Sequence, residues 1–259
     1  MKIIKHDLGA DITEVNIIPL ADLHLGSEHC LLKNIKKAID EVASGKNTYT
    51  VLNGDLINNA IKTSVSDIYK EKLSPEQALN KLVELFMPIK DKILSVVCGN
   101  HEARTYRLAG IDVLNYFCSK LGVEHLYHPV ASIIFLSFGT SRGRKKVRNT
   151  FSIYHTHGTG GGKTVGAKAN RLQNLSNVIH ADVYIHSHTH TPMIFKEDYI
   201  MTNCGNKGIK QISRLFVNTN AYEGFGGYGE VLGLKPSNHD YITIELSSNG
   251  YDKYKNARL

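Results

Sequence analysis

Residues 15–24 read Val-Asn-Ile-Ile-Pro-Leu-Ala-Asp-Leu-His, an apolar and partly β-branched run that stops at two polar side chains. The run predicts a buried strand over residues 15–20 that leads into a loop carrying Asp22 and His24. Alternate residues of an extended chain point to the same side, so this carboxylate and this imidazole lie within reach of one ion. The stretch therefore predicts a central strand with a candidate pair of metal ligands at its end.

The pattern of an apolar strand that ends at a polar cluster recurs four more times along the chain. The further clusters are Gly54-Asp55, Gly99-Asn100-His101-Glu102, His157-Gly158 and His188-Thr189-His190. Each cluster alone is explained by a turn, a helix cap or a solvated strand end. Five clusters in succession, each after a predicted strand, indicate one site built from loops at strand ends. Mixed imidazole and carboxylate donors suit Zn, Mn, Fe or Ni better than Ca or Mg.

Strand and helix periodicities alternate through the first half of the chain, which is typical of a layered α/β domain. Helices are expected over residues 31–42, after the capping signal Ser74-Pro75-Glu76-Gln77, and over residues 111–121 before Gly122, with strands at 49–52 and 93–97. The second half predicts a hairpin of strands 130–138 and 150–155, a helix over 167–178, and short strands at 183–186, 193–195, 214–217 and 241–246. The expected fold class is α/β, with two packed sheets and helices outside. No linker divides the chain, so one domain over residues 1–259 is expected.

Composition narrows the class of protein. The chain has 259 residues, and 31 Lys and Arg against 24 Asp and Glu give a net charge of +7. This surplus of positive charge indicates either solubility or a polyanionic partner such as nucleic acid. Apolar runs are too short to cross a membrane, and the first residues lack a secretory signal. Four scattered cysteines are typical of reduced thiols, so a cytoplasmic protein is expected.

Taken in order, the five clusters resemble the motifs of the calcineurin-like metallophosphoesterase superfamily: D-x-H, G-D, G-N-H-[DE], H before G, and G-H-x-H. The resemblance runs from Asp22 to His190, and Ser187 stands where the family has the glycine of the last motif. Residues 22–26, Asp-Leu-His-Leu-Gly, resemble the D-x-H-x-G form of nuclease-like members. The resemblance implies a four-layer α/β/β/α sandwich of two mixed sheets with flanking helices. It also points to the small stand-alone nuclease or phosphodiesterase type of bacteria and phages.

The resemblance further implies two divalent metal ions, with manganese expected and iron, zinc or nickel as alternatives. The implied ligands are Asp22, His24, Asp55 and His190 for one ion, and Asp55, Asn100, His157 and His188 for the other. Two such ions clamp the phosphoryl oxygens and lower the pKa of the attacking water, so that a metal-bound hydroxide attacks phosphorus. His101 is left free to protonate the leaving group, as an imidazole of ordinary pKa can near neutral pH. His155 and His186, two residues before ligands on the same strands, are expected to be packed rather than ligating.

The substrate is less narrowly constrained than the metal site. Asn58 and Asn59 stand where Ser/Thr protein phosphatases have an orienting Asp and a phosphate-binding Arg, which argues against a protein phosphatase. Arg104 and Arg107 are candidate replacement contacts to phosphate, with a surface role as the alternative.

Two further segments bear on the substrate. The run from His157 to Thr164 resembles a nucleotide-binding P-loop but lacks its first glycine, so its glycines are expected to approach the metal centre and its N–H groups to face a phosphate. Residues 142–148 hold five cations and no acid, which indicates either a solvated tip or a basic finger for nucleic acid. The sequence therefore favours a phosphodiesterase acting on DNA or RNA. The alternatives are a small-molecule phosphodiesterase or phosphomonoesterase, and a non-catalytic scaffold, which would be expected to lack some of the ligands.

Overall fold

The computed structural model places two six-stranded mixed sheets face to face, and it describes the chain except residues 63, 65–66, 141–147, 206, 227–229, 231–235, 237–238 and 250–251. The first sheet has the order β12-β11-β2-β3-β4-β5 and the second the order β1-β6-β7-β8-β10-β9. The strands of the first sheet are β12 (Asp252–Arg258), β11 (Thr243–Asn249), β2 (Glu14–Leu20), β3 (Thr48–Asn53), β4 (Ile93–Val97) and β5 (Tyr127–His128). Those of the second are β1 (Lys2–Gly9), β6 (Ala131–Phe138), β7 (Asn149–Thr156), β8 (Val183–His186), β10 (Gly208–Asn218) and β9 (Met193–Asn203). The α/β fold expected from the sequence is confirmed.

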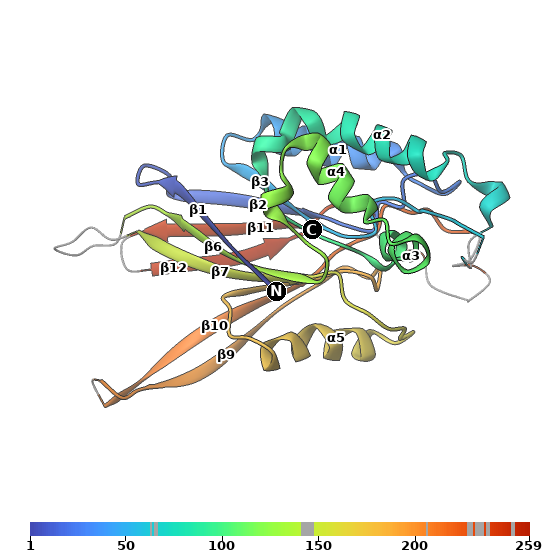
Figure 1. Cartoon of the computed structure of the whole chain (residues 1–259). Helices are drawn as coiled ribbons and strands as arrows, with labels where there is room; N and C mark the ends of the chain where they lie inside the picture. The colour runs from blue at the N-terminus through green and yellow to red at the C-terminus, as the bar shows by residue number, and fades with distance from the viewer. Residues whose placement is uncertain are drawn as a thin grey trace.

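Helices cover both outer faces of the pair of sheets (Figure 1). The helices are α1 (Leu32–Ser44), α2 (Pro75–Phe86), α3 (Asn100–Ala109), α4 (Val113–Leu121) and α5 (Val165–Gln173), with short 3-10 turns at Ile68–Lys70, Met87–Lys92, Glu124–Leu126 and Asn174–Asn177. In Figure 1, α1, α2 and α4 lie over the first sheet, whereas α5 lies beneath the second. The layers therefore follow the order helix, sheet, sheet, helix.

Three apolar clusters lie between these four layers. Side chains on opposite faces of β2 belong to two different clusters. Ile17 is buried between the sheets, in a cluster that includes Phe138, Phe151 and Val217. Its neighbour Ile18 points to the other face and joins the cluster under α1, α2 and α4. A third cluster lies between the second sheet and α5. Because both faces of β2 are covered, the strand ends in four consecutive apolar residues, 17–20, rather than alternating.

The helix ends follow the local signals in the sequence. Ser74 and Gln77 form a reciprocal capping box at the start of α2, with the Gln77 N–H donating to Ser74 Oγ at 3.3 Å. Gly122 ends α4 in the left-handed region at φ +73°. Backbone groups that lack partners inside a helix are satisfied in both places.

Four elements were not expected from the sequence. β1 and β12 are edge strands with polar sequences, and β5 has only two residues, so none of them presents an apolar run. α3 begins directly at Asn100, where only a polar cluster was recognised. The strands β9 and β10 also extend well beyond the predicted residues, as a long hairpin whose outer part is exposed on both strands. Edge and hairpin strands face water and therefore tolerate polar residues. Such strands lack the apolar pattern from which a strand is predicted.

The topology determines where the polar clusters meet. β2, β3 and β4 are parallel neighbours in the first sheet, and β7 and β8 are parallel neighbours in the second. Each of the five clusters begins at, or within two residues after, the carboxyl end of one of these strands. Carboxyl ends of parallel strands lie at one edge, so both sheets deliver their loops to the same end of the sandwich. Within the described part of the chain, no helix is both long and apolar enough to cross a membrane.

Candidate metal centre

The loops after β2 and β3 are joined by backbone hydrogen bonds, which holds their side chains in register. The Asp22 N–H donates to the carbonyl of Gly54 at 3.0 Å, and the His24 N–H donates to that of Asp55 at 3.1 Å. The carboxylate of Asp22 in turn accepts the N–H of His188 at 3.0 Å, which links this pair of loops to the second sheet. Three loops that are far apart in sequence thus share one hydrogen-bonded framework.

One group of ligand atoms comes from Asp22, His24 and His190, whose donor atoms all lie within 4.8 Å of one another. His190 Nε2 lies 3.2 Å from Asp22 Oδ1 and 3.2 Å from His24 Nε2. A carboxylate and two imidazoles that converge in this way can hold one divalent cation.

A second group comes from Asp55, His157 and His188, again within 4.8 Å. Asp55 Oδ2 lies 3.1 Å from His157 Nε2, and the amide oxygen of Asn100 lies 3.2 Å from the same nitrogen. Asp55 also belongs to a third group with His24 and His101. Asp55 therefore lies between the two ligand groups, and all seven sequence-predicted ligands are brought together with His101.

The backbone at these residues is strained. Asp22, His24, Asp55, His188 and His190 have φ between 45° and 67°, and they are five of the seven non-glycine residues with positive φ in the described ranges. The left-handed region costs side-chain-bearing residues free energy, and such strain gathers where function requires a particular side-chain direction. Four of these residues belong to the Asp-x-His and His-x-His motifs, so the same turn geometry is used in both sheets.

The site fits a metal because histidine imidazoles surround its two buried carboxylates. Asp22 and Asp55 are 0% and 1% exposed, and neither forms an ion pair with a Lys or Arg among the residues described. The Nε2 atoms of His24 and His190 face each other at 3.2 Å. Divalent cations would neutralise the carboxylates and accept the imidazole lone pairs. The donor set of carboxylate, imidazole and amide oxygen therefore matches the chemistry expected from the sequence.

Hydrogen bonds behind the imidazoles orient them toward the centre. His157 Nδ1 lies 2.8 Å from the carbonyl oxygen of Asn53, and His101 Nδ1 lies 2.7 Å from that of Asn58. Since a carbonyl only accepts, each Nδ1 carries a proton and each Nε2 faces the site. Burial lowers the pKa of His101 to about 3, although the Asp55 carboxylate opposes this, so His101 does not keep the ordinary pKa expected from its sequence.

His155 and His186 lie beneath the site and are engaged elsewhere, in line with the expectation that they do not ligate. His155 is held by Asn53 Oδ1 at 2.9 Å and Ser95 Oγ at 2.7 Å, and His186 by Asn218 Oδ1 at 2.7 Å.

Two carboxylates at the site had no assigned role in the sequence interpretation. Glu102 is buried and accepts the backbone N–H groups of Asp55, Leu56, Ile57 and Gly99 at 2.6–3.2 Å. Burial and the charge of Asp55 raise the pKa of Glu102 to about 7, while the N–H donors oppose the rise. Its place three residues after Gly99 is the position of a helix-capping Glu, which is a signal the sequence did contain.

The second of these carboxylates, Glu223, accepts the Ser27 hydroxyl at 2.8 Å, and the adjoining Tyr222 N–H donates to the Asp22 carbonyl at 2.9 Å. No local pattern marks Glu223, because its place depends on a contact about 200 residues away along the chain.

The candidate phosphate contacts are only partly brought to the centre. Arg104 is half-buried and donates to the carbonyl of Asn58 at 3.3 Å, the same oxygen that His101 contacts. Asn59 donates to the carbonyl of His101 at 2.6 Å, so it supports this loop. Arg107 is exposed. The basic segment 142–148 lies outside the described residues except for Arg148, which pairs with Asp7 at 2.6 Å.

The glycine-rich segment after His157 differs from a phosphate-binding loop. Gly158 has φ +95°, and a Cβ there would lie 2.0 Å from the His186 ring, so glycine is needed for this close approach. The carbonyls of Thr159 and Gly161 accept from the Arg171 guanidinium at 2.5 and 2.8 Å. At these two residues the carbonyls face a cation. That the N–H groups of this segment face a phosphate stays an expectation.

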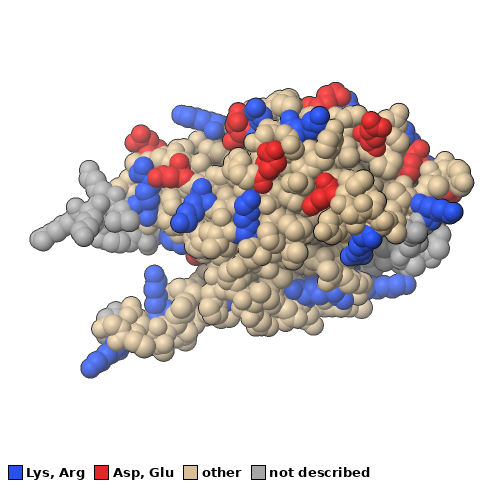
Figure 2. All heavy atoms as spheres, viewed as in Figure 1, with Lys and Arg blue, Asp and Glu red and all other residues tan. Residues whose placement is uncertain are grey.

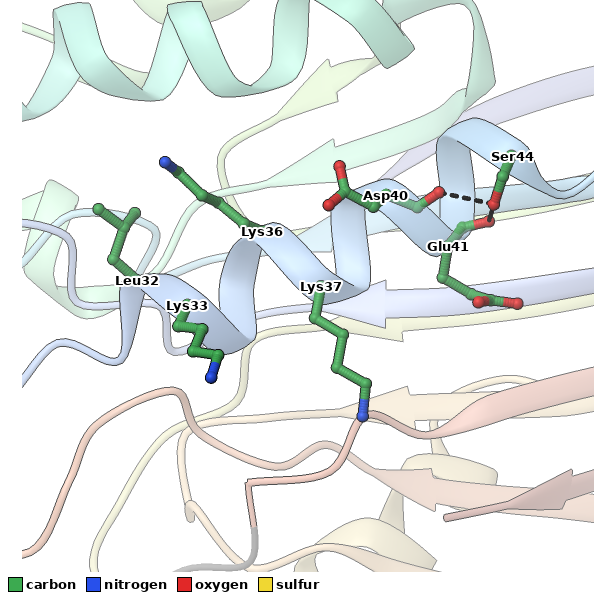
Figure 3. A pocket seen from close by; sticks show the side chains of 7 residues that line it. All are labelled: Leu32, Lys33, Lys36, Lys37, Asp40, Glu41 and Ser44. Carbon is green, nitrogen blue, oxygen red and sulfur yellow. Dashed lines mark hydrogen bonds between the residues drawn. The ribbon is translucent and has the colours of Figure 1, made fainter.

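A shallow hollow on the surface lies apart from this cluster, on the outer face of α1 (Figure 3). It is lined by Leu32, Lys33, Lys36, Lys37, Asp40, Glu41 and Ser44. Its Lys and acidic residues stand four apart along the helix, a spacing that suits a solvated helix face. None of its lining residues belongs to the ligand groups.

Comparison with known proteins gives one family. The sequence profile for calcineurin-like phosphoesterases matches residues 15–192, a segment that contains all five loops. No curated protein matches the chain significantly.

Several solved structures are similar at low identity. One is a predicted phosphoesterase from Streptococcus pneumoniae TIGR4, at 14% identity and a TM-score of 0.39, covering 95% of this chain and 99% of that chain. Another is a metallophosphoesterase from Sphaerobacter thermophilus, at 11% identity and a TM-score of 0.41, covering 89% and 83%. A third is GAP50 of the Plasmodium inner membrane complex, at 12% identity and a TM-score of 0.46, covering 92% and 83%.

We expect metal binding to release a proton from His157. Burial alone would lower the pKa of His157, but the adjacent Asp55 carboxylate raises it to about 10 in the metal-free protein. At pH 8 the imidazole is therefore protonated, and a cation must displace that proton to reach Nε2. Calorimetric titration with Mn²⁺ at pH 8, in two buffers of different ionisation enthalpy, should show release of about one proton or more. Mn²⁺ affinity should rise as the pH approaches 10.

The control separates His157 from other histidines. His157→Gln should lower this release by about one proton, whereas substitution of the exposed His125 by Ala should leave it unchanged. Equal heats in both buffers for the parent protein would contradict the assignment.

Proposed function

This chain belongs to the calcineurin-like phosphoesterase family, a family of metal-dependent hydrolases of phosphoester bonds, and from that premise we propose that it is a two-metal phosphodiesterase acting on DNA or RNA. The single observation that carries the two-metal proposal is the position of Asp55, whose carboxylate lies in one group with His157 and His188. It also lies in a group with His24, which is itself a member of the group of Asp22 and His190. Two cations close together repel each other, and a shared carboxylate offsets that repulsion.

The proposed ligands divide between the two sheets. One ion would be held by Asp22, His24, Asp55 and His190, and the other by Asp55, Asn100, His157 and His188. Manganese is the proposed metal, since imidazole and carboxylate oxygen together suit it. When bound, the pair of ions supplies Lewis-acid stabilisation of the phosphoryl oxygens and a water of lowered pKa.

His101 would handle the proton of the leaving group. Its Nδ1 is fixed on the Asn58 carbonyl, which leaves Nε2 facing the site, 3.8 Å from Asp55 Oδ2. Burial disfavours the protonated ring, so the negative charge of a bound phosphoester must favour it before His101 can donate. Arg104, next to the same carbonyl, would add a positive charge at the phosphate.

The charge of the chain supports a nucleic-acid substrate over a protein or a small molecule. On the face shown in Figure 2, acidic and basic side chains are mixed over the layer of α1, α2 and α4, whereas the α5 layer shows Lys and Arg. The net charge is +7, and the cations of segment 142–148 add a basic stretch between β6 and β7. When such cations contact a polyanionic backbone, they displace its condensed counterions, and the release of these counterions favours binding.

The four cysteines are unpaired, which suits the reducing cytoplasm. We also propose that residues 1–259 act as one catalytic domain, because a single apolar cluster joins the two sheets that share the site.

Asp55→Asn should remove both ions and nearly all hydrolysis, because an amide cannot supply the bridging charge. Metal content by elemental analysis and turnover of a nitrophenyl phosphodiester measure the two effects. Asp198→Asn is a matched control, since Asp198 is exposed on β9 and bonds only to Gln211 among the contacts described. Near-native activity of Asp55→Asn with two metals bound would exclude the bridging role.

His101→Ala should keep the metal content and lose about 10²–10⁴ in rate on esters with poor leaving groups. Esters with good leaving groups need no proton and should lose much less. The exposed His125→Ala serves as the control and should leave both rates unchanged. Loss of metal in His101→Ala would instead make His101 a ligand, consistent with its place in the group with His24 and Asp55.

Binding to single- or double-stranded DNA should weaken with salt, with a log–log slope of about −0.7 to −0.9 per phosphate contacted. Substituting Arg144, Lys145 and Lys146 by Ala should flatten the slope by up to about three contacts, because three backbone contacts are lost. Turnover of the small nitrophenyl diester should not change. The matched control substitutes Lys33, Lys36 and Lys37 on α1, an equal loss of charge on another surface (Figure 3).

Two outcomes would overturn parts of this substrate proposal. An unchanged slope in the Arg144, Lys145 and Lys146 variant would make the segment a solvated tip. A parent protein without salt-dependent DNA binding would favour a small-molecule phosphodiesterase or phosphomonoesterase in place of the nuclease.

A further inference from the structure

Helix α5 is anchored on the same sheet that supplies three of the proposed ligands. Its N-cap is Thr164, whose hydroxyl accepts the Ala167 N–H at 3.2 Å, shortly after the glycine-rich segment that follows His157. Its Leu172 is fully buried and packs in one cluster with Tyr184 of β8 and Phe216 of β10. The helix is therefore fixed to the second sheet, close to the ends of β7 and β8 (Figure 1).

Lys168 on α5 reaches the loop that carries two of the ligands. Its ammonium donates to the carbonyl of Thr189 at 2.9 Å and also to the hydroxyl of Thr191. Thr189 stands between His188 and His190, so this hydrogen bond restrains the peptide that joins them. Lys168 is half-buried.

Arg171, one helical turn further on, reaches the loop that carries His157. Its guanidinium donates to the carbonyls of Thr159 and Gly161 at 2.5 and 2.8 Å. Gly160 between them has φ +82°, and a Cβ there would lie 2.1 Å from Arg171 Nη1. The two carbonyls hold the guanidinium beside Gly160. The positive φ there favours glycine, and a larger residue would displace the guanidinium.

We propose that Lys168 and Arg171 are positioning residues that lock the loops of His157, His188 and His190 to α5 and so set the spacing of the ligands. This inference rests on the proposed two-metal function. Residues three apart in a helix lie on the same side, so one rigid face restrains both loops. Charge-assisted hydrogen bonds to backbone carbonyls suit this task because they hold the peptide itself.

The sign of the expected effect separates positioning from simple electrostatics. A lysine ammonium beside a metal centre repels divalent cations, so removing it would tighten metal binding if charge alone mattered. If Lys168 positions the ligands, removing it weakens metal binding instead, because the freed loop must be ordered each time an ion binds. The two roles therefore predict opposite shifts in affinity.

The experiment measures Mn²⁺ binding to the full-length protein by calorimetry, without substrate. Lys168→Met keeps an unbranched side chain of similar length and should weaken binding by about 10-fold or more. Arg171→Met should weaken it comparably. Lys168→Arg, which retains donors to the Thr189 carbonyl, should bind Mn²⁺ within about threefold of the parent protein. Electron paramagnetic resonance of the Mn²⁺-loaded protein should show weaker coupling between the ions in the Met variants.

Lys210→Met is the matched control, since Lys210 is an exposed cation towards the outer end of β10, eight residues from Asn218. It should bind Mn²⁺ like the parent protein. Thermal unfolding of the metal-free variants should match the parent closely, which separates local positioning from loss of the fold. Unchanged or tighter Mn²⁺ binding in Lys168→Met would overturn the positioning role while leaving the parent's metal-dependent hydrolysis intact. A parent protein that binds no Mn²⁺ would overturn the proposed function together with this inference.

Discussion

The buried carboxylate of Asp55 is the constraint around which the end of the sandwich is organised. A carboxylate without contact to solvent must be matched by hydrogen bonds and positive charge. Asp55 Oδ1 accepts the His101 N–H at 2.8 Å, and Oδ2 faces the His157 imidazole. Glu102 collects the N–H groups of Asp55 and the two residues after it. These contacts hold the carboxylate between two ligand groups, and the protonated His157 balances its charge until a metal cation takes that place.

The spacing of the ligand groups depends on the packing of the two sheets. Asp22, His24, Asp55 and Asn100 follow strands of the first sheet, whereas His157, His188 and His190 follow strands of the second. Asn53, the last residue of β3, spans the two, because its amide donates to the Thr156 carbonyl at 2.9 Å and to Ser187 Oγ at 2.6 Å. The inter-sheet apolar cluster lies directly behind this contact. The packing between the sheets therefore determines the distances between ligand atoms. Well-packed interiors hold such distances rigidly.

The strained backbone of the ligand loops is stabilised by hydrogen bonds from neighbouring segments. Five ligand residues occupy the left-handed region, which an isolated loop would avoid. The contacts that oppose this strain come from outside the loops: the Asp22 carboxylate on the His188 N–H, Lys168 on the Thr189 carbonyl, and Asn218 on the Thr189 hydroxyl at 2.8 Å. A rigid scaffold is therefore what allows short polar loops to present imidazoles in one direction.

The sequence by itself determined the central strands, the capped helices and the chemical types of the proposed ligands. Residues 15–20 and 93–97 are mostly apolar because both faces of their strands are covered. The Ser74 capping box is satisfied within four residues, so local pattern is sufficient there. Only the tertiary structure decided the edge strands β1 and β12, whose polar sequences pair on one side only.

Tertiary structure alone also decided the roles of Glu223, Lys168 and Arg171 and the lowered pKa of His101. Periodicity reports the burial of a residue's own strand or helix. These side chains are defined instead by contacts with loops elsewhere in the chain and by the low dielectric of a site that forms only when the two sheets pack.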